Sequence, residues 1–239
     1  LFTENIFHSL TSKIDSIKYQ KMPEATFLCI DNSDWMRNGD YSPNRMMAVQ
    51  EGCSLLCEAL MQRNPENVIG FLTFGGKACS VRETLTEDID RVSGSLASIA
   101  VGGESHFAYG VQIAMLALSH VKNTRSQKQI AVFVGSPIND SADRLKQLAT
   151  ALRKDDVGVS IISLGCPENT PILQQFTEQV QKNAHLYVVP ENGSVIDFLF
   201  TTALMGGDGG AGGAGGAGGV GGGVGQPGGG YGGEADDSE

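Results

Sequence analysis

The sequence predicts an α/β fold: a single doubly wound, mostly parallel sheet flanked by helices. Short apolar runs rich in strand-forming residues alternate with segments whose apolar residues recur every three or four positions, as in amphipathic helices. Elements that alternate in this way form a parallel sheet covered on both faces. From 206 to 233 the chain is mainly Gly with scattered Ala and Val, which offers nothing to bury and marks a tail outside the fold.

The first unit of this alternation is a strand, a polar loop and a helix. Residues 25–30 form a short apolar run that ends at Asp31, and a polar loop occupies 31–41. Ser42 and Pro43 are typical of a helix start, because Ser caps free amides and Pro is tolerated at the first helical position. Apolar residues at spacings of three and four then predict a helix through 46–60.

The later elements follow the same rules of periodicity. The helix at 107–121 is the most regular, and Asp140 or Ser141 is expected to cap the helix that carries 145–152. The other predictions are strands at 68–74, 130–134, 157–164 and 186–189, an edge strand at 78–85, and helices at 89–99, 171–182 and 195–204. Ligands of such sheets bind beyond the carboxyl ends of the strands. The loops 31–41, 101–106 and 135–139 are therefore the places to look for a site.

The chain divides into one domain at 22–204, an N-terminal extension at 1–21 and a Gly-rich acidic tail at 205–239. The tail has five acidic residues and no Lys or Arg, so the rest of the chain holds 22 acidic residues against 17 basic ones. This balance, without a basic stripe, argues against binding to nucleic acid or to an anionic membrane surface. No apolar run is long enough for a membrane span, and 1–21 lacks the apolar block of a secretory signal. We expect a cytoplasmic and nuclear location.

The five cysteines are odd in number, lie mostly in apolar stretches and lack C-x-x-C spacing. Such residues are typical of buried, reduced thiols.

Asp31, Asn32 and Ser33 stand where the first strand passes to the first helix. This placement resembles the von Willebrand factor A family, whose metal site uses an Asp-x-Ser-x-Ser loop, a Thr on a second loop and an Asp after a later strand. Trp35 replaces the second Ser, Glu104 replaces the Thr, and Gly135 stands at the position of the Asp. A hard cation needs several converging oxygen ligands. We therefore expect no metal at the degenerate site of Asp31, Ser33 and Glu104, and no other cofactor. Asp31 is expected either to cap its own loop or to contact a partner.

Two other motifs are near misses. Gly75-Gly76-Lys77 lacks the first glycine and the hydroxyl of a phosphate loop, which favours a turn. Residues 103–107 approach the G-x-S-x-G nucleophile pattern, with Phe107 in place of the second glycine. Ser105 and His106 are adjacent, and adjacent side chains seldom face each other. We expect no enzyme.

A closer resemblance lies within the A-domain group. Residues 22–43 read MPEATFLCIDNSDWMRNGDYSP, and they are similar to the opening of the ubiquitin-receptor non-ATPase subunits of the 26S proteasome regulatory particle. The same resemblance continues in NPENV at 64–68, QIAMLAL at 112–118 followed by His120, and GSPI at 135–138. It spans about 22–204.

This resemblance implies a von Willebrand factor A-like fold and a non-catalytic scaffold and substrate-receptor role in ubiquitin-dependent degradation. The implied partners are lid and base subunits, including the neighbourhood of the deubiquitinase. The implied contact surface comprises Asp31, Ser33, Arg37, Asn38, Asp40 and Tyr41. The alternative, in a different class, is a metal-dependent ligand-binding or adhesion A domain.

The two ends depart from the resemblance. In that family polyubiquitin is bound by short helices after the A domain, and this chain contains no such segment, so we expect truncation and little or no ubiquitin binding. Met22 falls where the family normally starts, so 1–21 is expected to be an upstream extension or leader. Ile6, Leu10, Ile14 and Ile17 nevertheless form a weak amphipathic pattern, so a docking segment remains open.

Overall fold

The computed structural model describes residues 22–181, 183–202 and 204. Its elements are β1 (Glu24–Ile30), η1 (Asp34–Arg37), α2 (Arg45–Arg63), β2 (Val68–Thr73), β3 (Gly75–Gly76), β4 (Ser80–Thr86), α3 (Ile89–Ala97), β5 (Glu104–Ser105), α4 (Phe107–Ser119), β6 (Gln127–Val134), α5 (Ala142–Lys154), β7 (Gly158–Leu164), α6 (Asn169–Val180), β8 (Ala184–Val189) and α7 (Val195–Phe200). The expected ends 1–21 and 205–239 lie outside the described residues.

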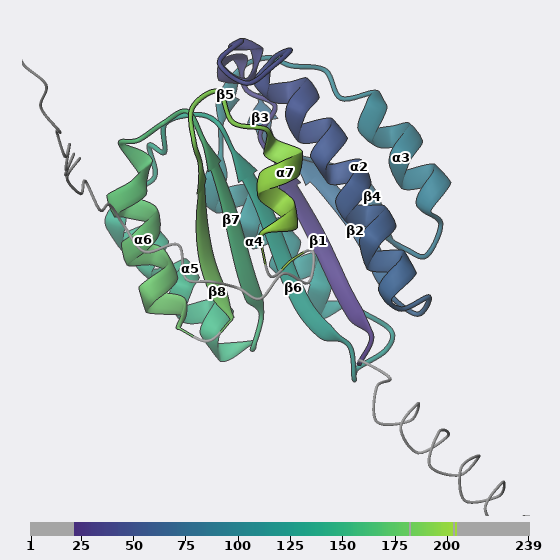
Figure 1. Cartoon of the computed structure of the whole chain (residues 1–239). Helices are drawn as coiled ribbons and strands as arrows, with labels where there is room; N and C mark the ends of the chain where they lie inside the picture. The colour runs from purple at the N-terminus through teal and green to yellow at the C-terminus, as the bar shows by residue number, and fades with distance from the viewer. Residues whose placement is uncertain (1–21, 182, 203, 205–239) are drawn as a thin grey trace, which may run out of the picture.

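The main sheet has six strands in the order β4-β2-β1-β6-β7-β8. All neighbours are parallel except β4, which pairs antiparallel with β2 at one edge. Helices α2, α3 and α7 cover one face, and α4, α5 and α6 cover the other (Figure 1). The predicted doubly wound, mostly parallel sheet with an edge strand at 78–85 is confirmed.

Alternate residues of each inner strand supply the two cores. Phe27 and Val132 belong to the core under α4, α5 and α6, whereas Leu28 and Phe133 belong to the core under α2, α3 and α7. The inner strands are therefore apolar at nearly every position, because side chains on both faces are buried. This explains why these strands read as continuous apolar runs in the sequence.

The start of the first helix was predicted wrongly. Helix α2 begins at Arg45, and the side chain of Asn44 accepts a hydrogen bond from the Met47 amide. Ser42 and Pro43 precede the helix and are joined by a cis peptide bond. The ring of Tyr41 is buried, so residues 42–44 lead the chain back to the surface before helix α2 starts at Arg45.

Two short segments between the main elements also differ from expectation. Gly75–Gly76, expected as a turn, pairs antiparallel with Glu104–Ser105, expected as a loop. Gly75 is needed there because a Cβ atom at this residue would lie 2.5 Å from the Ser33 amide nitrogen. This close approach packs the loop after β2 against the loop after β1.

Candidate functional site

The carboxylate of Asp31 lies at the carboxyl end of β1, and hydrogen-bond donors from two loops surround it. One oxygen accepts from the Ser33 amide at 2.8 Å, and the other accepts from the Gly135 amide at 3.1 Å and from the Ser136 hydroxyl. Asp31 has no exposed surface. A buried carboxylate is tolerated only where such partners replace water. Asp31 thus caps its own loop and joins it to the loop after β6.

The residues around Asp31 do not fit a divalent cation. Three donors already engage its two oxygens, and the side chains of Trp35 and Glu104 are exposed. A Cβ atom at Gly135 would lie 2.5 Å from the Met36 sulfur, so the aspartate of the A-domain pattern has no room while Met36 is buried there. Among the described residues no group of three or more His, Cys, Asp or Glu side chains is placed to hold a metal.

Two hydroxyl groups lie close to the A-domain pattern, that of Ser33 within it and that of Ser105 next to Glu104. The Oγ atoms of Ser33 and Ser105 are buried, and neither has a hydrogen-bond partner within the described part of the chain. A buried hydroxyl without a protein partner is commonly satisfied by water. These two hydroxyls alone provide too few ligands for a hard cation, which takes six or more oxygens.

The side chain of Arg45 connects three loops at this edge of the sheet. Its guanidinium group donates to Asp40 at 2.5 Å, to the Gly165 carbonyl at 3.1 Å and to the carbonyl of Gly135. Only 3% of Arg45 is exposed, and its planar fork of donors suits this role. Its hydrogen bond to Asp40 holds the pKa of that carboxyl below its usual value. Arg45 therefore ties the loop after β1 to the loops after β6 and β7.

Tyr41 makes a second tie across the sheet. Its hydroxyl donates to the Val189 carbonyl at 2.9 Å and accepts from the Gly165 amide at 3.1 Å. Only 1% of Tyr41 is exposed, and burial raises the pKa of its phenol. The loop after β1 is thus fixed to the ends of β7 and β8.

The exposed part of this loop is a small surface that we name the platform: Asp34, Trp35, Arg37, Asn38 and Gly39. Its underside is held by Asp34, whose amide donates to the Gly103 carbonyl and whose carboxylate accepts from the Gly103 amide. The Arg37 guanidinium adds a hydrogen bond to the Val101 carbonyl at 2.7 Å. Trp35 is 48% exposed. A large, exposed aromatic side chain on a polar surface is typical of a protein contact.

Comparisons with known proteins establish the family. A model of the von Willebrand factor type A domain matches residues 26–137. The 26S proteasome regulatory subunit rpn10 of Schizosaccharomyces pombe is 35% identical over 185 residues, which cover 77% of this chain and 76% of the relative. The crystal structure of the SpRpn10 VWA domain matches with a TM-score of 0.71 and 34% identity, over 76% of this chain and 96% of that one. The chain belongs to the Rpn10 family.

A plant relative is also named as a regulatory subunit of the 26S proteasome. The "26S proteasome non-ATPase regulatory subunit 4 homolog" of Arabidopsis thaliana is 39% identical over 191 residues, which cover 77% of this chain. The chain spans about half the length of that relative, since the match covers 50% of it. These matches confirm both the resemblance and the A-domain fold inferred from the sequence.

In the structure of this chain, the six expected contact residues differ in burial and fall into two groups. Arg37 and Asn38 are exposed and Asp40 is partly exposed, so their side chains are available to a partner. The side chains of Asp31, Ser33 and Tyr41 are buried, so the expectation that they form the contact surface itself needs correction. Asp31 and Tyr41 fix the loop from below, because each is fully used in bonds inside the domain.

Trp35 is the contact candidate that sequence reasoning missed. Its place in the A-domain pattern drew attention to the lost ligand instead of to the side chain that replaced it. The signal was present in the sequence, because a Trp inside a loop of polar residues has no apolar face to join.

Ser105 and His106 do not form a nucleophile and base pair. The Nε2 atom of His106 lies 3.0 Å from the Gly76 carbonyl, so this ring nitrogen bonds backbone and not Ser105. All five cysteines are free, and four of them are buried. Burial raises the pKa of Cys57 to about 12 and that of Cys79 to about 11, so these thiols are protonated at neutral pH.

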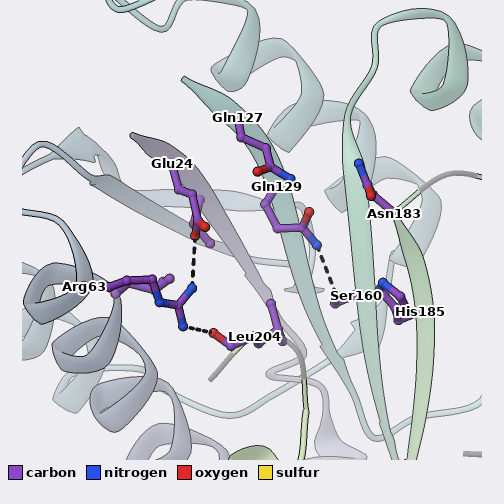
Figure 2. A pocket seen from close by; sticks show the side chains of 10 residues that line it. Glu24, Arg63, Gln127, Gln129, Ser160, Asn183, His185 and Leu204 are labelled. Carbon is purple, nitrogen blue, oxygen red and sulfur yellow. Dashed lines mark hydrogen bonds and ion pairs between the residues drawn. The ribbon is translucent and has the colours of Figure 1, made fainter. Parts of the chain in front are cut away.

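Two hollows lie away from the platform. A polar pocket of about 270 Å³ opens over β1, β6, β7 and β8 near their amino ends, and four of its polar side chains are bonded within it (Figure 2). Arg63 there bonds Glu24 at 3.4 Å and the Leu204 carbonyl at 2.7 Å, and Gln129 donates to Ser160. A larger groove of about 920 Å³ lies between β4 and the carboxyl end of α4.

No helix within the described residues is long and apolar enough to cross a membrane.

Proposed function

We propose that this chain is a non-catalytic docking subunit of the 26S proteasome regulatory particle and that the platform is its contact surface. Membership of the Rpn10 family supports the assembly, and the exposed Trp35 on a loop with a fixed backbone supports the surface. The proposed partners are lid and base subunits close to the deubiquitinase, and the proposed location is the cytoplasm and nucleus, where such particles work.

The frame below the platform supports this role. Three ties converge on the same loop: Asp31 with Ser136, Arg45 with Asp40, and Tyr41 with Val189. A loop fixed in advance loses little conformational freedom on binding, and this preorganisation favours affinity. The frame has the shape of a metal-binding loop cluster but is held by side chains, so docking through it needs no cation.

Recovery of the proteasome from cells tests the proposal. Tagged chain, expressed in fission yeast whose own rpn10 has been removed, should recover lid and base subunits in affinity purification with mass spectrometry. Trp35→Ala should lower that recovery about tenfold or more, because a central aromatic anchor contributes about 2 kcal/mol or more to an interface. Met47→Ala is the matched control, since Met47 is 52% exposed and Trp35 is 48% exposed.

The outcomes separate the assembly from the surface. If the parent chain recovers no proteasome subunits, the docking role is wrong. If Trp35→Ala and Met47→Ala both recover them in full, the role stands and the platform is the wrong surface.

The receptor role is not proposed for the A domain itself. We propose that polyubiquitin binds through a segment beyond the A domain. Titration of ubiquitin into isotope-labelled chain should therefore leave the NMR signals of 22–204 unshifted. A saturable shift confined to one face of the domain would contradict this.

A further inference from the structure

The groove between β4 and α4 is an apolar surface that no element of the described chain covers. Its floor is formed by Phe27, Val68, Leu85, Ala117 and Val121, and Val81 at its rim is 44% exposed. Helices α4, α5 and α6 pack on this face of the sheet (Figure 1), and the edge strand β4 and the carboxyl end of α4 form two sides of the groove. At about 920 Å³ the groove is the size of a ligand or peptide site.

Helix α4 gives a second, independent sign that this region is covered in the working protein. The helix contains no charged residue and is mostly apolar, with Gln112 and Ser119 as exposed polar exceptions. Yet Tyr109 is 47% exposed and Leu116 is 61% exposed. Together with Ile113 they form a stripe at spacings of four and three on the face of α4 next to Ala117, which lines the groove.

The chain enters the domain at the rim of this groove. The Gln127 amide donates to the Pro23 carbonyl at 2.8 Å, and Ser126, the residue before it, lines the groove. On the other side the Glu24 amide donates to Asn67, which stands between the groove residues Glu66 and Val68. Residues 1–21 therefore join the domain between two loops that border the hollow.

We propose that residues 1–21 of this chain bind in the α4–β4 groove as an amphipathic helix. Ile6, Leu10, Ile14 and Ile17 recur at spacings of four, four and three, which puts them on one face of a helix. From Met22 to Ile17 five residues span at most about 18 Å when extended, enough to carry that face into the adjoining groove. The polar pocket beside Glu24 on the other face of the sheet offers no comparable apolar floor.

Charge agrees with this occupant. The groove is bordered by Glu66, Glu87 and Asp88 against the single cation Lys122. The part of the segment next to the domain carries Lys13, Lys18 and Lys21 against the single acid Asp15. The segment thus brings a positive excess to a negative rim, and complementary potentials of this kind fix orientation in an interface.

Hydrogen exchange measured by mass spectrometry tests the proposal on the full chain. Deleting 1–21 should speed amide exchange in β4 and at 117–126 about tenfold, because the groove loses its cover. Exchange in β8, the opposite edge of the sheet, should not change. Equal exchange in both chains at the groove overturns the proposal. So does protection that falls when the protein is diluted, because the occupant is then a second copy's segment.

Two matched pairs of variants separate docking from general damage. Val81→Asp should remove the protection while Val188→Asp should not, since both valines are 44% exposed on opposite edge strands and receive the same charge. In the segment, Ile14→Asp should remove it while Ser12→Asp, on the opposite face of the helix, should not. Loss of protection in both members of a pair, or in neither, would overturn the proposal.

Discussion

The loops after β1, β6 and β7 meet under the platform, and we call this region the loop edge. The loop edge and the α4–β4 groove depart from ordinary packing in opposite ways. At the loop edge, polar residues such as Asp31 and Arg45 are buried and fully bonded. At the groove the apolar side chain of Val81 is exposed, and Leu116 is exposed on the adjoining helix α4. Buried polar groups and exposed apolar groups are the informative exceptions in a folded domain.

The two regions contribute differently to the stability of the fold and to binding. Buried polar ties at the loop edge hold one loop shape, so changing them should damage the fold first. Exposed apolar groups contribute little to the isolated fold, so changing them should damage binding first. Variants can break this comparison by acting on stability in the wrong region.

The largest stability effect is expected for Arg45→Ala. The change removes a buried side chain and leaves the Gly135 and Gly165 carbonyls without their donor, which should lower the free energy of unfolding by about 3 kcal/mol. Urea denaturation measures it. Arg37→Ala is the control, since 63% of the Arg37 side chain is exposed and such ion pairs contribute below about 1 kcal/mol. Equal losses for the two variants would show that Arg45 does not hold the loops.

Gly135→Ala should come next. The new Cβ atom would lie 2.5 Å from the Met36 sulfur and 3.3 Å from the Arg45 side chain, so overpacking should cost about 2 kcal/mol. Met36→Ala added to the same chain should relieve part of that loss, and a double-mutant cycle from urea denaturation measures the coupling. Additive losses would mean that Met36 does not exclude a side chain at 135. Gly135→Asp should likewise create no cation site, so added Mg²⁺ should leave its thermal midpoint unchanged.

The sequence predicted the sheet because burial on both faces leaves a plain apolar signature in strands such as 130–134. It also located the loop edge, since strand ends in a parallel sheet meet at one side. The ties within that edge could not be predicted. Arg45 is the first residue of a helix, between the partly exposed cap Asn44 and exposed Met47, and nothing local shows that its guanidinium reaches carbonyls 90 and 120 residues away. The helix start was missed for the same reason, because the burial of Tyr41 depends on β7 and β8.

A smaller effect on stability is expected for Asp40→Asn, and it should depend on pH. The pKa of Asp40 is lowered, first by its hydrogen bond to Arg45, so its ionised form stabilises the fold. That contribution is complete above the carboxyl pKa of the unfolded chain, near pH 4, and is lost as pH falls through the lower pKa of the folded state. Asp40→Asn should therefore cost about 1 kcal/mol at pH 7 and progressively less below about pH 4. Urea midpoints of the two proteins across this range measure the difference, and a constant gap would contradict it.

The smallest effect on stability is expected for Trp35→Ala, although Trp35 has the largest side chain of the loop edge. The side chain is 48% exposed and none of the ties described above passes through it, so the free energy of unfolding should change by at most about 0.5 kcal/mol. Urea denaturation under the same conditions as Arg45→Ala gives the comparison. A loss as large as that of Arg45→Ala would mean that Trp35 belongs to the frame, and a fall in proteasome recovery would then report damage to the loop. A neutral value keeps the frame and the contact surface separable, because one side chain then changes binding while the loop below it stays intact.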